Sequence, residues 1–329
     1  MPATRSPVIP VAEIVRNGFV EGHHYGSVVA IDPDGAVVWS VGIVTDPILP
    51  RSCNKPLQAL GMLRAGLDLP PDLLALACAS HSGEPFHIEG VRRLLAAVGL
   101  SEADLQTPPD YPLDDGAREQ VIRDGGSKAP VFMNCSGKHA AMLATCAFNG
   151  WPTETYLDPD HPVQQAIAAT FAEMTGEPVT VTAVDGCGAP LLSTSLVGLA
   201  RAFGRLALGV DGSGAEDAGA ARIADAIRSH PAYVSGTTRD ERALLTAVPG
   251  AIGKAGAECC YAVALPDGRA FALKADDGAP RVRPVLMAEA LRTSGVLDDP
   301  GVDADAVRRT GLVELLGGGV AVGEIRACY

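Results

Sequence analysis

The chain has 329 residues, of which 47% are hydrophobic and 20% charged, and its formal net charge is −13. This composition supplies enough apolar side chain for a large core and excludes a disordered chain. The acidic charge disfavours nucleic acid as a partner, because a polyanion would be repelled. No apolar stretch of membrane-spanning length is free of charges, and residues 1–18 lack the apolar run of a signal peptide. We therefore expect a cytoplasmic protein with neither a nucleic-acid nor a membrane partner.

Two β-hairpins are predicted, one near each end of the chain. The first joins residues 26–31 and 36–41 through the turn sequence Asp-Pro-Asp-Gly. The second joins residues 259–265 and 269–274 through Pro-Asp-Gly. Because the two hairpins have the same pattern, we expect one sheet built from both ends of the chain.

Helical spacing of apolar residues occupies the middle of the chain. It predicts helices over residues 54–65, 89–98, 138–149, 162–175, 218–229 and 284–293. The most apolar long segment, residues 191–210, carries two arginines and predicts an amphipathic helix. Strands at both ends with helices between them indicate an α+β layer fold, mainly antiparallel sheet flanked by helices. No linker divides the chain, so we expect one domain over residues 1–329.

Eight cysteines are spread along the chain. In a chain of this length without a signal peptide they do not indicate a disulfide framework. We expect most of them to be reduced, buried and equivalent to small hydrophobic side chains. A functional cysteine must therefore be recognised from its neighbours.

The first candidate for chemistry is the Ser-x-x-Lys spacing of Ser52 and Lys55. Residues three apart at a helix start share one face, so the lysine amine can reach the serine hydroxyl. A neutral lysine can accept the serine proton, which requires burial or a nearby cation to lower the pKa of the amine. The spacing alone is weak, and an N-capping serine beside a solvated lysine is the competing interpretation.

Two further segments carry small polar residues or a lysine. Ser80 follows the apolar run of residues 73–77, and its hydroxyl could relay a proton, bind substrate or merely cap the element. Lys254 lies in a Gly-Lys-x-Gly segment just before the second hairpin. The order Ser-x-x-Lys and then Lys-x-Gly is also found in serine penicillin-recognising enzymes, which raises the weight of both segments.

Two cysteines differ from the others because they lie in glycine-containing polar turns. Cys135 and Cys187 could be thiolate ligands for a soft or borderline ion such as zinc. Two cysteines are few for a structural zinc site, so ordinary loop cysteines remain the alternative. The neighbouring His139 could serve the site or could be a hydrogen-bonded structural histidine.

Taken together, these segments resemble the rhizobial-type (class 3) L-asparaginase family, also called the asparaginase II family. The resemblance covers nearly the whole chain, and its most specific motifs are N-C-S-G-K-H and C-A-S-H-S. The ordered motifs are R-S-x-x-K-P (51–56), C-A-S-H-S (78–82), N-C-S-G-K-H (134–139), D-H-P (160–162), D-G-C (185–187) and G-K-x-G (253–256).

The resemblance implies a fold similar to serine β-lactamases and glutaminases of that type. It also implies hydrolysis of L-asparagine to aspartate and ammonia by a homodimer. Two Ser–Lys pairs form the catalytic centre of the family, and they correspond here to Ser52 with Lys55 and Ser80 with Lys254.

A zinc ion beside the substrate is a further implication of the resemblance. Its ligands correspond to Cys135, Lys138 and Cys187. Residues 237–241 offer no further cysteine, so we expect water rather than a fourth protein ligand. Residues adjacent to these positions are expected to bind substrate or orient the site: Arg51, Asn134, His139 and Asp185.

The sequence leaves the nucleophile open. Ser52 can attack with Lys55 as base, while Ser80 and Lys254 carry protons or act as the nucleophilic pair themselves. Two other functions also remain: a β-lactamase-like or peptidase-like serine hydrolase, and a non-catalytic, zinc-responsive binding protein. A thiol enzyme based on Cys53 is disfavoured because no histidine partner lies nearby in the sequence.

Overall fold

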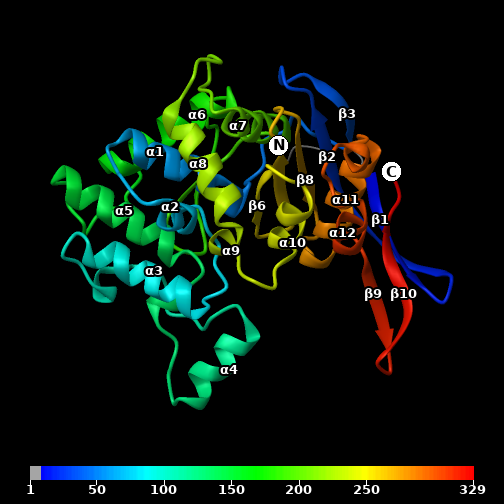
Figure 1. Cartoon of the computed structure of the whole chain (residues 1–329), viewed down its shortest axis with the longest axis horizontal. Coiled ribbons are helices and arrows are strands. Elements are labelled where there is room, and N and C mark those ends of the chain that lie inside the picture. Colours follow the sequence, from blue (N-terminus) through cyan, green and yellow to red (C-terminus); the bar gives the residue numbers. More distant parts are fainter. Residues whose placement is uncertain (1–8) are drawn as a thin grey trace, which may run out of the picture.

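The structure, a computed structural model, describes residues 9–329. The prediction about residues 1–18 therefore lies partly outside the described residues. Eight strands form one antiparallel sheet, and most helices lie to one side of it (Figure 1). This arrangement confirms the predicted α+β class.

The sheet draws its strands from both ends of the chain. Their spatial order is β6 (Ile252–Gly256), β7 (Cys260–Ala264), β8 (Ala270–Ala275), β2 (Phe19–Ile31), β1 (Ile9–Arg16), β10 (Val320–Ala327) and β9 (Val313–Gly317), with β3 (Val37–Val41) paired to β2. A separate two-stranded sheet pairs β4 (Thr182–Val184) with β5 (Pro190–Leu192).

Both predicted hairpins are present, as β2–β3 and β7–β8. They meet in the sheet because β2 pairs with β8, with Val28 opposite Leu273. The expectation of one sheet built from both ends is therefore confirmed. Strands β1, β6, β9 and β10 extend this sheet beyond what the sequence pattern predicted.

All seven predicted helices are found, and α6 and α8 have the predicted bounds. The helices are α1 (Lys55–Arg64), α2 (Pro71–Ala77), α3 (Pro85–Ala96), α4 (Asp115–Arg123), α5 (Ser136–Asn149), α6 (Pro162–Thr175), α7 (Leu196–Leu208), α8 (Ala218–Ser229), α9 (Pro231–Val234), α10 (Asp240–Ala247), α11 (Arg283–Thr293) and α12 (Ala304–Thr310). Helix α7 packs on β2, β7 and β8, and α11 also packs on the sheet. No helix of residues 9–329 is long and apolar enough to cross a membrane.

Helix α1 is central to the helical part of the molecule. Its residues from Lys55 to Met62 are all buried, because α2, α5, α6 and α8 surround it. The closest approach is to α6, where a Cβ on Gly61 would lie 2.8 Å from the Cα of Ile167. A helix enclosed in this way holds Lys55, at its first position, in the interior.

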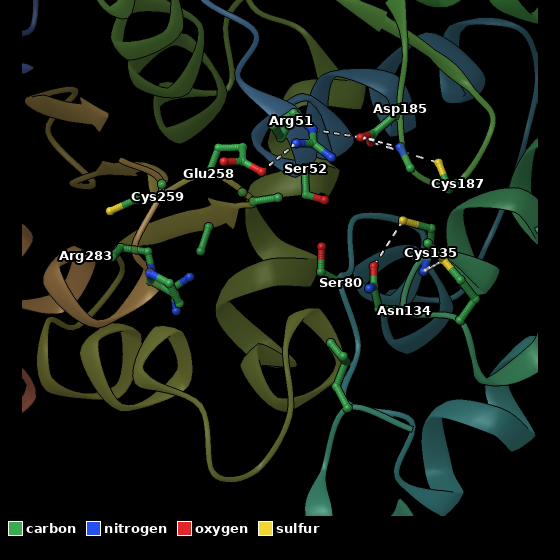
Figure 2. A pocket seen from close by; sticks show the side chains of 18 of the residues that line it. Arg51, Ser52, Ser80, Asn134, Cys135, Asp185, Cys187, Glu258, Cys259 and Arg283 are labelled. Atoms are coloured by element: carbon green, nitrogen blue, oxygen red, sulfur yellow. Dashed lines mark hydrogen bonds and ion pairs between the residues drawn. The ribbon is translucent and has the colours of Figure 1, made fainter. Parts of the chain in front are cut away.

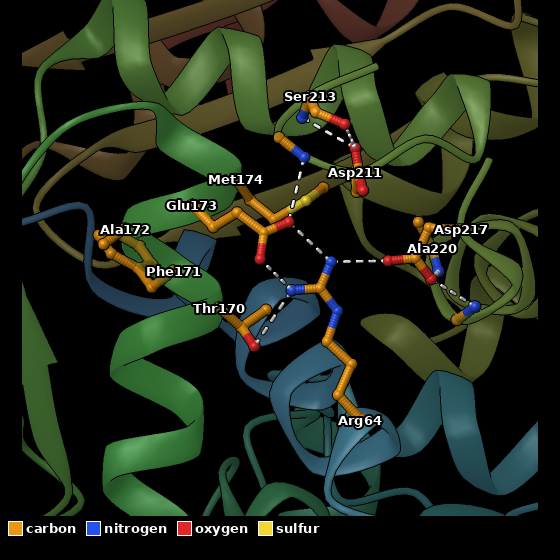
Figure 3. Close-up of polar contacts among 12 residues, drawn as sticks. Arg64, Thr170, Phe171, Ala172, Glu173, Met174, Asp211, Ser213, Asp217 and Ala220 are labelled. Atoms are coloured by element: carbon orange, nitrogen blue, oxygen red, sulfur yellow. Dashed lines mark hydrogen bonds and ion pairs between the residues drawn. The ribbon is translucent and has the colours of Figure 1, made fainter. Parts of the chain in front are cut away.

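An ion-pair network fixes the other end of α1 (Figure 3). Arg64 Nη1 lies 2.7 Å from Glu173 Oε2 on α6, and Arg64 Nη2 lies 2.7 Å from Asp217 Oδ2, the residue that caps α8. Bidentate arginine geometry and several partners make such a network more effective than an isolated surface pair. The network therefore holds three helices in a fixed relation.

We expect Gly61→Ala to lower the free energy of unfolding by about 1–3 kcal/mol, because the added methyl group forces α1 away from α6. Gly116→Ala, in the exposed helix α4, is the matched control, because the atom closest to the added methyl group is a side-chain oxygen of Asp114 at 3.2 Å rather than backbone, and its effect should be within about 0.5 kcal/mol. Urea unfolding of both variants measures the difference. A Gly61→Ala protein as stable as the wild type would contradict the tight packing described for this helix pair.

Candidate active site

A pocket of about 360 Å³ lies where the helical part of the molecule meets the sheet (Figure 2). Its size is in the usual range for a small-molecule site. Ser52 and Ser80 lie on facing walls of this pocket in Figure 2. Seven of the residues singled out in the sequence line it: Arg51, Ser52, Ser80, Asn134, Cys135, Asp185 and Cys187.

The wall that carries Ser52 is the 3₁₀ turn η1 (Arg51–Asn54), which leads into α1. Arg51 has a φ of +54°, a conformation that is uncommon outside glycine. Its Nε donates to Asp185 Oδ1 at 2.8 Å, and its Nη1 lies 3.5 Å from Glu258 Oε1. Two acidic residues on separate segments therefore hold this strained turn in place.

Strand β6 presses against the same turn. A Cβ on Gly256 would lie 2.6 Å from the carbonyl oxygen of Pro50, so only glycine allows this approach. Glu258 and Cys259, which follow β6 and line the pocket, have φ values of +54° and +51°. Unusual backbone conformations thus gather on the rim of one pocket, as is common at functional sites.

Lys55 is 1% exposed, which excludes the solvated lysine of the competing interpretation. Its Nζ donates to the carbonyl oxygen of Ala79 at 2.5 Å and to Ser80 Oγ at 2.9 Å. Within residues 9–329, no hydrogen bond joins Lys55 to Ser52. The hydroxyl–amine contact is therefore made between the first lysine and the second serine, across the end of α2.

Lys254 lies in β6 and is fully buried. Its Nζ donates to Glu241 Oε1 at 2.7 Å and to the carbonyl oxygen of Ala255 at 2.7 Å, rather than to Ser80. Burial lowers the pKa of Lys254, the charge of Lys55 lowers it further, and Glu241 opposes both effects. The anionic partner of this lysine was not predicted.

Glu241, at the start of α10, is also fully buried. Burial raises the pKa of its carboxyl, but the charges of Lys254, Arg239 and Arg283 outweigh burial and bring the pKa to about 2. In the sequence, residues 237–241 were considered only for a cysteine. A carboxylate thirteen positions from a lysine has no local signal, because only the packing of α10 on β6 brings them together.

The predicted zinc ligands also converge. Cys135 and Lys138 come from the start of α5, and Cys187 comes from the turn between β4 and β5. Lys138 Nζ donates to Cys187 Sγ at 3.1 Å, and all three side chains are buried.

The pKa values of the two cysteines in this cluster are shifted in opposite directions. A hydrogen bond from the Cys135 thiol and the charge of Lys138 lower the pKa of Cys187 despite its burial. The same hydrogen bond, together with burial, raises the pKa of Cys135. Cys187 is therefore the more acidic of the two thiols in this cluster.

His139 lies behind the cluster and does not line the pocket. Its Nδ1 lies 2.7 Å from the hydroxyl of Tyr156, while its buried Nε2 has no hydrogen-bond partner. Burial lowers its pKa to about 4, so the ring is neutral near neutral pH. The contact with Tyr156 matches the structural alternative for this histidine.

Two sulfurs and one amine in one buried cluster are a donor set that suits zinc. Among residues 9–329, no group of three or more His, Cys, Asp and Glu side chains is arranged to hold a metal ion. A metal at this place would therefore need Lys138 as a ligand, with its amine neutral. His139 Nε2 adds a polar atom beside the same cluster.

The pocket places two serine hydroxyls beside a buried lysine amine, a combination of groups that suits nucleophilic attack by a serine. The family described as L-asparaginase II matches residues 12–327, which is nearly the whole chain. The protein belongs to the L-asparaginase II family, and the resemblance seen in its motifs is confirmed. It is thus an asparaginase-type amidohydrolase whose substrate is a small amide.

Several solved structures are similar at low identity. A β-lactamase from Mycobacterium bovis is 16% identical, with a TM-score of 0.45, over 82% of this chain and 94% of that one. A putative β-lactamase from Bacteroides dorei is 16% identical, with a TM-score of 0.41, over 76% and 84%. EstCE1, a hydrolase with promiscuous acyltransferase activity, is 11% identical, with a TM-score of 0.40, over 87% and 93%. A search of curated proteins finds none that matches the chain.

The Lys254–Glu241 pair predicts a pH-dependent stability. Because the pKa of Glu241 is about 2 in the folded protein, against an ordinary 4.5, its contribution is present above pH 4.5 and is lost as the pH falls towards 2. We expect the free energy of unfolding of Glu241→Gln to fall by about 3 kcal/mol less than that of the wild type across this window. Urea unfolding as a function of pH measures both slopes.

Glu173→Gln is the control, because it removes a carboxylate from the more exposed Arg64 network. This variant should keep most of the wild-type pH dependence. Equal slopes for the wild type and Glu241→Gln would show that the buried pair does not contribute as described.

Proposed function

We propose that the protein hydrolyses L-asparagine to L-aspartate and ammonia through a serine nucleophile and a buried lysine base. The observation that carries this proposal is the 2.9 Å contact between Lys55 Nζ and Ser80 Oγ beside a pocket that Ser52 also lines. Membership of the L-asparaginase II family supports the substrate. A homodimeric and cytoplasmic enzyme remains our expectation from the sequence.

The charge distribution of the pocket suits a free amino acid. Arg51, Arg239 and Arg283 supply positive charge, and Asp185 and Glu258 supply negative charge. In Figure 2, Arg283 and Asp185 lie at opposite sides of the pocket, with the two serines between them. Asparagine carries a carboxylate, an ammonium group and a neutral amide, so a pocket with side chains of both charges beside two hydroxyls suits it.

We assign the attack to Ser52. It is more exposed than Ser80, which is 8% exposed and engaged by Lys55. Ser52 Oγ adds to the amide carbonyl carbon of the substrate, and its proton passes to neutral Lys55, with the Ser80 hydroxyl as the intermediate carrier. The distorted backbone of η1 presents this hydroxyl to the pocket.

The second half of the reaction reverses the proton path. The tetrahedral intermediate collapses, the C–N bond breaks, and the protonated Lys55 returns its proton through Ser80 so that ammonia leaves. A water molecule then attacks the aspartyl ester, gives its proton to the same amine, and releases aspartate and Ser52. Each proton removed from a nucleophile is thereby returned to a leaving group.

We further propose that Cys135, Lys138 and Cys187 hold zinc at the edge of the pocket. When bound, zinc supplies Lewis acidity or a fixed link between the two loops. The chain's own part is to keep Cys187 as a thiolate and Lys138 within reach of it. Asn134 lies beside the cluster, where its Oδ1 is 3.1 Å from the Cys135 sulfur.

Ser52→Ala should lower kcat for ammonia release from asparagine by about 10³-fold or more, because the nucleophile is removed. Ser80→Ala should lower kcat by about 10²-fold, because proton transfer is impaired while the attacking group remains. Steady-state ammonia release from asparagine and from glutamine, together with intact-mass detection of an acyl-enzyme, measures both effects.

Ser213→Ala, which removes a surface hydroxyl bonded to Asp211, is the matched control and should keep wild-type turnover. Near-normal hydrolysis by Ser52→Ala would defeat the assignment of the nucleophile. A wild-type protein that releases no ammonia from asparagine would defeat the proposed substrate.

The zinc proposal predicts that Cys135→Ala and Cys187→Ala each lose most of the bound metal, about one ion per chain. Zinc content should also fall at lower pH, because a lysine ligand must be neutral. Elemental analysis of the purified protein measures occupancy, and kcat/KM before and after chelation shows whether the metal takes part in turnover.

Cys146→Ala is the matched control, since Cys146 is buried on the same helix α5. It should retain its zinc. Equal zinc content in all three cysteine variants would contradict the ligand assignment, whereas an unchanged kcat/KM after complete chelation would restrict the metal to a structural role.

A further inference from the structure

A fully buried ion pair lies beside the pocket and has no part in the proton path described above. Lys254 and Glu241 are both 0% exposed, and Lys254 Nζ lies 2.7 Å from Glu241 Oε1. The same carboxylate oxygen accepts from the N–H of Ala255 at 2.8 Å. Two hydrogen bonds to one oxygen fix the carboxylate against β6, the strand that also presses on η1.

The ion pair belongs to a buried group that contains two lysines and only one carboxylate in contact with them. Lys55 and Lys254 are close enough for the charge of the first to lower the pKa of the second. Only Lys254 contacts a carboxylate, because the partners of Lys55 are a carbonyl oxygen and a hydroxyl. Two buried ammonium groups with one anion leave an uncompensated charge, which the interior of a protein strongly disfavours.

The partners decide which amine is without its proton. A carboxylate stabilises the ammonium form of a lysine over the neutral amine. A neutral hydroxyl can hydrogen-bond to either form, so it does not require the lysine to be charged. We infer that Glu241 is a positioning residue, which holds Lys254 as the charged lysine so that Lys55 is the neutral amine that accepts the serine proton. This inference rests on the proposed function, since it assumes a lysine base.

Other titratable groups face the pair from each neighbouring element. Arg239 Nη2 lies 3.3 Å from Glu241 Oε2, and Arg283, whose charge also acts on Glu241, is paired with Asp240. Burial raises the pKa of Cys78 to about 12 and that of Tyr261 well above its usual value, so both are neutral at the pH of an assay. The Cys53 thiol donates to the carbonyl oxygen of Lys254 at 3.0 Å. Glu241 is thus the carboxylate in contact with Lys254.

A purely structural role predicts a different outcome from a role in charge placement. A structural pair, once broken, lowers the amount of active protein but leaves the pH dependence of the remaining activity unchanged. A charge-placing residue changes the pH dependence itself. Without Glu241, the pKa of Lys254, already lowered by burial, falls further. Lys55 then has no charged lysine beside it, and the separation of the two buried amines into one charged and one neutral group is lost.

The test compares Glu241→Gln with Glu241→Asp and the wild type. Glutamine keeps the size of the side chain and an oxygen for the Ala255 N–H, but it removes the charge. We expect Glu241→Gln to lower kcat for asparagine by about 10–100-fold with a smaller change in KM. The acidic limb of the kcat/KM profile should move to higher pH by about one unit. Glu241→Asp, which keeps the charge, should move it less.

Glu173→Gln, in the Arg64 network away from the pocket, is the control and should leave both kcat and the limb unchanged. A Glu241→Gln protein whose acidic limb coincides with that of the wild type would overturn the inference, whether or not kcat falls. Should Glu241→Gln fail to fold, Lys254→Met decides, because it removes the neighbouring cation itself: an acidic limb at the wild-type pH overturns the inference, and a limb at higher pH supports it.

A second measurement separates this inference from the proposed substrate. A fluorophosphonate probe reacts with an activated serine whatever the natural substrate, and peptide mass spectrometry locates the labelled residue. Labelling of the pocket serines should be about tenfold slower in Glu241→Gln at neutral pH. Slower labelling in a protein that does not hydrolyse asparagine would retain the role of Glu241 and reject the substrate. Equal labelling rates in an active asparaginase would retain the substrate and reject the role of Glu241.

Discussion

The structure depends on how three lysine side chains are accommodated in its interior. Lys55, Lys138 and Lys254 are among the largest fully buried side chains of residues 9–329. A buried amine must be hydrogen-bonded, and a buried ammonium also needs an opposite charge. Lys55 donates to a hydroxyl and a carbonyl oxygen, Lys138 donates to the sulfur of a cysteine, and Lys254 donates to a carboxylate. The three solutions lie around one pocket and give its walls different chemical properties.

The fold brings these solutions together through two close backbone approaches. Gly61 lets α1 lie against α6, so Lys55 begins a helix that is enclosed on all sides. Gly256 lets β6 lie against the turn that carries Ser52. Because β6 also carries Lys254 and contacts α10, the packing that shapes the serine turn also sets the distance to Glu241. Stability and the geometry of the pocket therefore share the same contacts.

The sequence predicted the elements better than the contacts between them. Alternating apolar residues and Pro-Asp-Gly turns identified both hairpins, and helical periodicity identified α6 and α8 with their bounds. Motif order also placed Ser52, Ser80 and the cysteine cluster at one pocket. The partners of the lysines were not predictable, because a lysine side chain reaches far beyond its own turn. Lys55 thus contacts Ser80 rather than its sequence neighbour Ser52, and Lys254 contacts a glutamate that lies outside any recognised motif.

The segment of residues 237–241 shows why the absence of one residue type does not leave a position without function. It has no cysteine to add to the sulfur ligands, and it supplies Arg239 to the pocket and Glu241 to the interior instead. A carboxylate differs from a thiol in that it is ionised throughout the neutral range and accepts several hydrogen bonds at once. Placed beside Lys254, it makes this side of the pocket ionic, while the side of Cys135 and Cys187 is dominated by sulfur. A lysine amine then has a different proton affinity on each side, which is what a reaction that moves protons between serine, amine and leaving group requires.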